Sequence, residues 1–129
     1  MILIDRNLLP EPQNIIYALD NDLDIKFEGW VIGIGDHGYG PLQGFKHDTH
    51  LRGVRVEIGL TVNGNLIAWV KRYDKSNDAC DATIGETPDD ILAWLRKDSG
   101  GKLGPATKKA WAQACEYGPL KAYAFQEVS

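Results

Sequence analysis

Alternation of apolar and polar residues is most regular over residues 54–73. The apolar residues of the first half fall on one side of an extended chain: Val54, Val56, Ile58, Leu60 and Val62. Asn63-Gly64 follows, and this dipeptide between two β-rich runs indicates a tight hairpin, because a type I′ turn needs positive φ at both central residues. We therefore predict a hairpin in which Val62 and Asn65 flank a two-residue turn. Its second arm is apolar on both sides, which is typical of a central strand.

Two further strands are predicted in the first third of the chain. Residues 2–4 are apolar and predict a short strand. Residues 25–34 alternate, and Gly29 interrupts the alternation as a glycine in a bulge does. Residues 14–19 are apolar but too few to be assigned to helix or strand by periodicity. The polar run 20–24 that separates the two apolar runs predicts a turn.

The last third of the chain predicts a loop, two helices and a final strand. Residues 74–86 are polar and predict a loop. Thr87 and Pro88 are typical of a helix start, and an apolar stripe follows them: Ile91, Leu92 and Leu95. Pro105 begins a second helix, whose apolar face holds Ala106, Ala110, Trp111, Ala114 and Cys115. Residues 120–127 alternate and predict the returning strand.

Strands that precede helices along the chain favour the α+β class with a mostly antiparallel sheet, and we expect the C-terminal helical hairpin to pack on one face of that sheet. The 129 residues are close to the common size of one domain, so we expect a single globular domain over 1–129. Hydrophobic residues make up 43% and charged residues 25%, which excludes collagen-like and long disordered chains. The tryptophans are expected to anchor the core: Trp30, Trp69, Trp94 and Trp111.

Charge and cysteine content narrow the classes of partner. The formal net charge is −4, with acidic residues predominating over 1–40 and basic residues over 41–75. Phosphate binding demands a dense basic stripe, so nucleic acid is the last-ranked partner.

The first ten residues resemble neither a signal peptide nor a membrane span. Cys80 and Cys115 form no Cys-x-x-Cys pair, and we expect a cytoplasmic protein with free thiols, no membrane association and no cofactor.

The acidic turn begins like a calcium-binding loop, with Asp20, Asp22 and Asp24 at alternate positions. Such a loop needs glycine at its sixth position and glutamate at its twelfth, where this chain has Ile25 and Val31. Calcium binding of that type is therefore excluded. The turn is interpreted as a solvated acidic surface that could face a basic partner.

Residues 35–53 are rich in glycine and predict a loop of nearly twenty residues, a length that is often functional. Residues 33–38 match the glycine pattern of a dinucleotide-binding loop. That loop must lead into a helix, because the helix N-terminus holds the pyrophosphate. Gly40 and Pro41 follow instead, so we interpret the match as chance.

The three histidines of the chain lie close together in the sequence, at His37, His47 and His50, beside Asp36 and Asp48. Neutral imidazole binds metal ions and exchanges protons near neutral pH, and an acidic neighbour can fix its tautomer. A metal site of His37, His47, Asp48 and His50 is thus one hypothesis, and acid–base catalysis by Asp36 and the histidines is another. The i, i+3 spacing of His47 and His50 converges only in a helix, which the flanking glycines disfavour, so solvated loop histidines are the preferred interpretation.

Our leading hypothesis is a non-catalytic protein-binding inhibitor, such as an immunity protein or a phage-encoded inhibitor of a host defence system. A small acidic domain with no evident catalytic constellation needs only one shaped, charged surface for this role. The expected partner is another protein with a basic surface. The expected contact residues are Asp20, Asp22, Asp24, Tyr39 and Arg55. The alternative is a small metal- or histidine-dependent enzyme of hydrolase type, built on the loop at 35–53.

Overall fold

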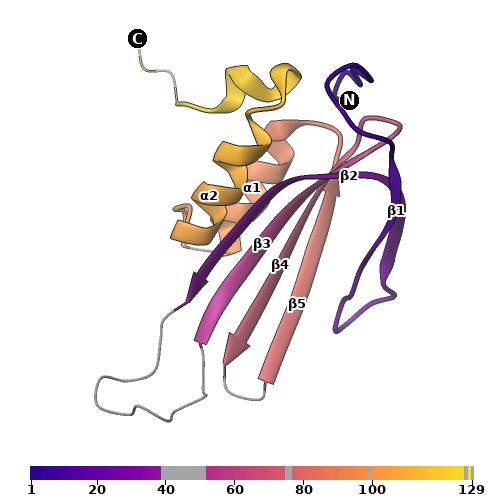
Figure 1. The fold of residues 1–129 in the computed structure, drawn as a ribbon. Helices are drawn as coiled ribbons and strands as arrows, with labels where there is room; N and C mark the ends of the chain where they lie inside the picture. Colours follow the sequence, from indigo (N-terminus) through magenta and orange to yellow (C-terminus); the bar gives the residue numbers. More distant parts are fainter. Residues whose placement is uncertain (39–51, 75–76, 99, 127, 129) are drawn as a thin grey trace.

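The computed structural model describes residues 1–38, 52–74, 77–98, 100–126 and 128. It contains a five-stranded antiparallel sheet with the order β1-β2-β3-β4-β5 (Figure 1). The strands are β1 Gln13–Tyr17, β2 Ile25–Gly38, β3 Arg52–Thr61, β4 Leu66–Asp74 and β5 Asn77–Gly85. The helices are α1 Pro88–Asp98, α2 Pro105–Ala114 and the short 3₁₀ helix η1 Gly118–Tyr123. The α+β class and the antiparallel sheet are thereby confirmed.

The β3–β4 hairpin forms as predicted, but its turn is of another type. The Thr61 N–H donates to the Asn65 carbonyl at 2.9 Å, and the Gly64 N–H donates to the Thr61 carbonyl at 2.9 Å. Gly64 has φ of 88°. This is the pattern of a three-residue loop that ends in a glycine in the left-handed conformation. The expected two-residue type I′ turn is wrong, because Thr61 rather than Val62 pairs with Asn65.

Replacing Gly64 by valine is expected to destabilise the fold by about 1–3 kcal/mol. A β-branched residue is strained at positive φ, and a Cβ atom at this position would overlap the carbonyl oxygen of Ile2. Urea denaturation measures the loss. Asn63→Ala is the control, since Asn63 is exposed and its replacement should change the free energy of unfolding by less than about 0.5 kcal/mol. Equal losses in the two variants would contradict the assigned turn.

Strand β2 is longer than predicted, and its irregularity lies elsewhere. It continues through Gly38, so the start of the expected loop at 35–53 is strand. The register with β3 shifts between Val31 and Gly33, not at Gly29. At Gly29 a Cβ atom would overlap the Leu60 carbonyl oxygen. That glycine therefore allows close approach of two strands, whereas the bulge occurs at Ile32.

Three other element predictions are wrong. Residues 77–85, expected as loop, form β5, an edge strand in which Asp78 and Asp81 remain exposed. The expected strand at 120–127 is replaced by η1 and the irregular residues after it, in which Leu120 is buried and the other described residues are exposed. Residues 2–4 form no strand, although the Ile2 N–H donates to the Gly64 carbonyl at 2.8 Å.

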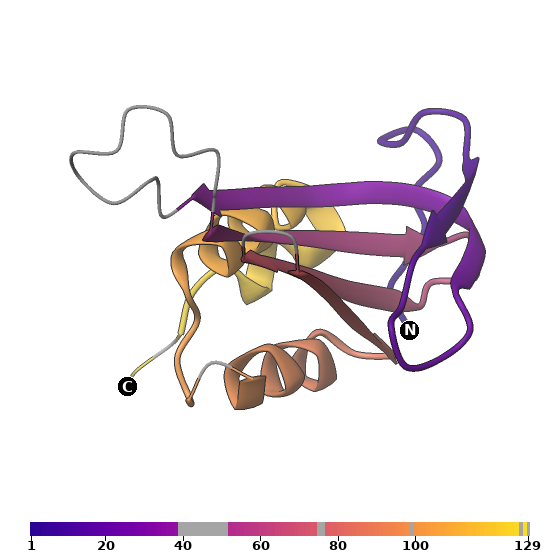
Figure 2. The same ribbon diagram turned by 90° about the horizontal axis from the view of Figure 1, so that it is seen from below.

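One face of the sheet and the helices share the larger hydrophobic cluster, called here the helix-side cluster. The predicted residues of β3 contribute Val56, Ile58 and Leu60, all fully buried. The predicted stripes of both helices join them: Ile91, Leu92, Leu95, Ala106, Ala110, Trp111, Ala114 and Cys115. The α2 helix contacts β2 and β3, whereas α1 contacts β4 and β5 (Figures 1 and 2). Because the two helices contact different strands, their packing as a hairpin is not confirmed and stays a prediction.

Two glycines of β2 allow α2 to approach closely. A Cβ atom at Gly33 would overlap the Ala110 carbonyl oxygen, and one at Gly35 would overlap the Ala106 carbonyl oxygen. At Gly38 a Cβ atom would meet nothing within 4 Å. The first two glycines of the dinucleotide-like pattern therefore serve helix–sheet packing.

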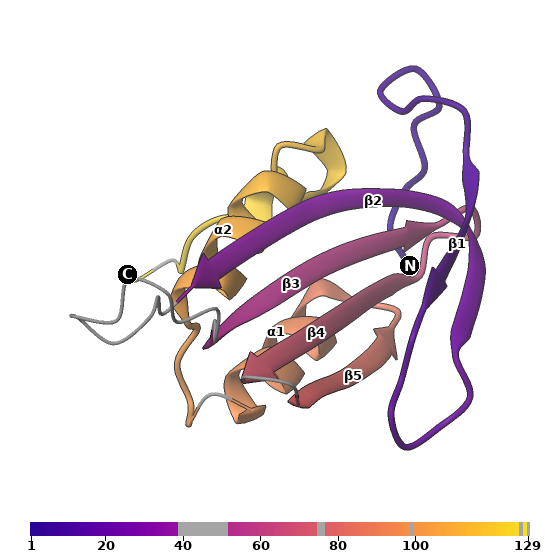
Figure 3. The same cartoon turned by 60° about the horizontal axis from the view of Figure 1, so that its bottom comes forward.

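The opposite face of the sheet carries a smaller aromatic cluster of Tyr17, Phe27, Ile67 and Trp69. The sheet curls, so that β1 departs from the direction of β3 and β4 (Figure 3). The Tyr17 ring stacks on Trp69 with centroids 5.3 Å apart, and the Trp69 indole N–H donates to the Ala18 carbonyl at 2.9 Å. The aromatic cluster thus holds the end of β1 over this helix-free face.

Candidate functional site

A row of neighbouring residues crosses four strands on the helix-free face, and we call it the cross-strand row. Asp36 on β2 pairs with Arg55 on β3. Arg55 in turn pairs with Lys71 on β4, and Lys71 pairs with Cys80 on β5. Side chains of directly opposed residues in a sheet lie on the same face and within contact range. The pairing therefore places two cations side by side, with a carboxylate at one end and a thiol at the other.

Arg55 is the centre of the hydrogen bonding in this row. Its Nη1 lies 2.6 Å from Asp36 Oδ2, and its Nε lies 2.9 Å from Glu57 Oε2. The side chains of Arg55 and Asp36 are 37% and 51% exposed, whereas that of Glu57 is only 15% exposed. The hydrogen bond with Glu57 is the main cause that raises the pKa of Arg55. The two carboxylates hold the guanidinium in one orientation while leaving part of it open to solvent.

Glu57 connects Arg55 of the cross-strand row to Tyr17 of the aromatic cluster. The Tyr17 hydroxyl donates to Glu57 Oε1 at 3.4 Å, a long hydrogen bond. Burial raises the pKa of Tyr17, and the negative charge of Glu57 raises it further. Tyr17 therefore stays neutral across the physiological pH range and can keep donating to Glu57.

The acidic turn at residues 20–24 meets the far end of the cross-strand row. The Cys80 N–H donates to Asp20 Oδ2 at 2.8 Å, and the Asp20 N–H donates to the Cys80 carbonyl at 3.3 Å. Asp24 accepts from the Leu19 N–H at 3.1 Å, and Asp22 accepts from the Leu23 N–H at 2.7 Å. The predicted contact residues Asp20 and Arg55 thus belong to one continuous line along the helix-free face.

A cleft of about 410 Å³ is lined by residues of the acidic turn and of β5. Asp20 and Asp22 line it from the turn, and Arg72 and Asp81 line it from the sheet. The lining holds more carboxylates than cations, so the cleft adds to the acidic surface of the turn. A basic group entering the cleft would find oxygen acceptors on both walls.

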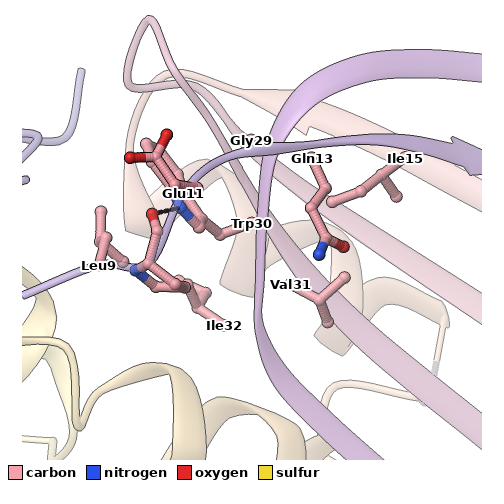
Figure 4. Close-up of a pocket in the computed structure, with 9 residues that line it drawn as sticks. Leu9, Glu11, Gln13, Ile15, Gly29, Trp30, Val31 and Ile32 are labelled. Carbon is pink, nitrogen blue, oxygen red and sulfur yellow. Dashed lines mark hydrogen bonds between the residues drawn. The ribbon is translucent and has the colours of Figure 1, made fainter.

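A second and apolar pocket of about 260 Å³ lies where β1 leaves β2. Figure 4 shows Leu9, Trp30 and Ile32 around it, with Glu11 beside them. The Trp30 indole N–H donates to the Pro10 carbonyl at 2.7 Å, and the guanidinium of Arg6 lies 5.5 Å from the Trp30 ring centroid. This pocket is formed by the N-terminal segment against β2, away from the charged residues of the row.

The candidate enzyme residues are not brought together by the described structure. Asp36 and His37 are consecutive in β2, so their side chains project to opposite faces of the sheet. Tyr39, His47, Asp48 and His50 lie outside the described residues. Within the described ranges, no three His, Cys, Asp or Glu side chains gather as they would around a metal ion. The metal- or histidine-dependent enzyme stays a prediction.

The two thiols are expected to react at very different rates with an aromatic disulfide reagent at pH 8. Burial raises the pKa of Cys115 to about 11. The pKa of Cys80 is also raised, first by burial and then by the negative charge of Asp20. A raised pKa lowers the fraction of reactive thiolate, and the buried Cys115 is also shielded from the reagent. Only Cys80 should react in the folded protein, more slowly than a free thiol.

Absorbance of the released thiolate measures these rates. Cys80→Ser should leave no reaction until the protein unfolds, and Asp20→Asn should accelerate the reaction of Cys80. Rapid reaction of Cys115 in the folded Cys80→Ser variant would contradict the assigned burial.

Neither Lys71 nor Glu57 was among the contact residues expected from the sequence. Lys71 lies 3.6 Å from Asp78 on β5, in a segment that was expected to be loop. The alternation of residues 54–73 already placed Arg55 and Glu57 on one side of a strand. The predicted two-residue turn would place Arg72, not Lys71, opposite Arg55, so Lys71 enters the row only through the three-residue loop of the observed hairpin.

Comparison with protein-family models, with curated proteins and with solved structures finds no match for this chain. In the parts of the chain that the structure describes, no helix is both long and apolar enough to cross a bilayer.

Proposed function

We propose that this protein is a non-catalytic inhibitor that binds another protein in the cytoplasm through the cross-strand row and the acidic turn. Such an inhibitor would be an immunity protein or a phage-encoded inhibitor of a host defence system. The partner is a protein that presents a basic surface to the acidic turn. The observation that carries the proposal is the continuous line from Asp36 through Arg55 and Lys71 to Cys80 and Asp20.

The chemistry of this line suits protein recognition. Arginine and aromatic side chains contribute strongly to protein interfaces, and Arg55 lies between two carboxylates beside the aromatic cluster. Its ion pairs and the hydrogen bonds of Asp20 fix these side chains before binding, which reduces the entropy lost on association. The acidic turn at the end of the line favours encounter with a basic partner.

Capture from the cells that produce the protein tests the proposal, with Arg55→Gln compared against the unchanged chain. Glutamine keeps hydrogen-bonding atoms near Asp36 and Glu57 while removing the positive charge. We expect a partner at near-stoichiometric yield with the unchanged chain, and about a tenfold or greater loss of affinity with Arg55→Gln.

The matched control is Lys108→Gln, which removes one exposed positive charge from α2 on the opposite side of the molecule. It should retain the partner fully. Thermal unfolding of all three proteins separates lost binding from lost folding. Recovery of no partner over several growth conditions, or equal binding by Arg55→Gln and the unchanged chain, would count against the proposal.

A further inference from the structure

The fork where β1 leaves β2 exposes a short backbone edge that no strand of the described chain pairs. The β1–β2 register ends with Gln13 opposite Gly29. The Glu28 carbonyl accepts from the Val62 N–H on the β3 side of the strand. Alternation along an antiparallel strand therefore turns the N–H and C=O of Val31 toward the outer side. One backbone donor and one acceptor thus face the apolar pocket that Val31 helps to line.

Both ends of this open edge are closed by other parts of the chain. On one side the N-terminal segment turns away, because the Pro10 carbonyl accepts from the Trp30 indole N–H at 2.7 Å. Pro10 and Pro12 have no N–H and could not continue the ladder of β1. On the other side Gln113 of α2 accepts from the Ile34 N–H at 2.8 Å. About 10 Å of strand lies between these contacts, so about three residues of an added chain fit there.

The pocket beside this edge is suited to one large apolar side chain (Figure 4). Its volume is about 260 Å³, below the roughly 300–1,000 Å³ of pockets for drug-sized ligands. Leu9 and Ile32 line it beside the helix-side cluster, and Ile15 lines it beside the aromatic cluster. Among the described residues that line the pocket, Glu11 alone carries a charge. Apolar walls, one carboxylate and a free backbone edge together favour a peptide as the ligand.

We propose that the fork binds the first residues of a peptide chain whose N-terminal residue is large and apolar, such as leucine or phenylalanine. The peptide runs parallel to β2, starts beside Glu11 and Gln13, and places its first side chain in the pocket. Its first carbonyl accepts from the Val31 N–H, and its third residue donates to the Val31 carbonyl, as in a parallel ladder. This site is separate from the cross-strand row and goes beyond the proposed inhibitor function.

The start of β1 and the charge of Glu11 decide the orientation of the peptide. A chain added to this edge meets Gln13, the first residue of β1, so one end of the chain lies there. The Glu11 carboxylate attracts an α-ammonium group and repels an α-carboxylate. The N-terminus is therefore the end that fits. Arg6 lies 5.5 Å from the Trp30 ring centroid but is not among the residues that line the pocket.

Fluorescence polarisation with a six-residue peptide tests this site on the purified chain. The probe is Leu-Ala-Ala-Ser-Gly-Gly with a fluorescent label at its C-terminus. It is compared with an N-acetylated copy and with a copy that begins with serine. Acetylation removes the positive charge and should weaken binding about fivefold or more. Serine leaves the apolar pocket unfilled and should weaken binding about tenfold or more.

Glu11→Gln should abolish the preference for the free amine over the acetylated peptide. The matched control is Glu28→Gln, which removes an exposed carboxylate of β2 that does not line the pocket and should keep the preference. Hydrogen exchange at the Val31 amide should slow when the leucine peptide binds. Equal binding of the free and acetylated peptides, or no binding of the leucine peptide up to millimolar concentration, would overturn the proposal. Because the probe contacts no residue of the cross-strand row, that failure would leave the proposed function standing.

Discussion

Gly35→Ala is expected to destabilise the fold by about 3 kcal/mol, near the upper end of ordinary overpacking losses. The added methyl group would overlap the Ala106 carbonyl oxygen, so α2 must move away from β2 to accommodate it. That movement would loosen the contact of Ala106 and Ala110 with the helix-side cluster. Equilibrium unfolding in urea measures the loss.

Gly38→Ala provides the control within the same strand. A Cβ atom there meets nothing within 4 Å, so the free energy of unfolding should change by less than about 0.5 kcal/mol. The two glycines belong to the same dinucleotide-like pattern, so the comparison shows which of them is needed for helix–sheet packing. Similar losses at Gly35 and Gly38 would contradict the close helix–sheet contact.

Ile58→Ala is expected to cost about 3 kcal/mol, as large-to-small replacements in cores usually do. Ile58 is 0% exposed and belongs to the cluster that both helices share, so its loss leaves a cavity that sheet and helices cannot easily close. Ile16→Ala, at a position on β1 that is 62% exposed, should cost no more than about 1 kcal/mol. Thermal or urea unfolding of both variants measures the difference, and equal losses would contradict the assigned core.

The hairpin and the two helices could be predicted because their signals are local. Val56, Ile58 and Leu60 share one side of a strand through simple alternation, and the helix starts at Pro88 and Pro105 follow from capping chemistry. The turn type was not predicted, because Asn63-Gly64 fits both a two-residue and a three-residue hairpin loop. The observed loop also accepts a hydrogen bond from outside the hairpin, donated by the Ile2 N–H to the Gly64 carbonyl.

Elements that depend on distant partners were not predictable from one sequence. Strand β5 is polar because it lies at an edge, and its strand character comes from pairing with β4 rather than from its own alternation. The segment at 120–127 alternates by coincidence, since Leu120 is the one buried residue among those described in it, 120–126. Gly33 and Gly35 resemble a nucleotide-binding pattern until the position of α2 is known.

The candidate site was predicted in part. Asp20 and Arg55 were each selected from local charge, but nothing in the sequence joins them. Their connection needs the register of four strands and the contact of the acidic turn with Cys80. Asp36 was assigned to a histidine site, whereas the alternation of β2 directs it toward Arg55 and away from His37. Four other predicted site residues lie outside the described part of the chain: Tyr39, His47, Asp48 and His50.

Hydrogen exchange of the protein with and without its captured partner tests the binding surface most directly. We expect slower exchange at the amides of β3 and β4 around Arg55 and Lys71, and at Asp20 and its neighbours in the acidic turn. The amides of α1 should exchange equally fast with and without the partner. Protection confined to the helices, with the cross-strand row and acidic turn unchanged, would contradict the assignment of the helix-free face as the binding surface.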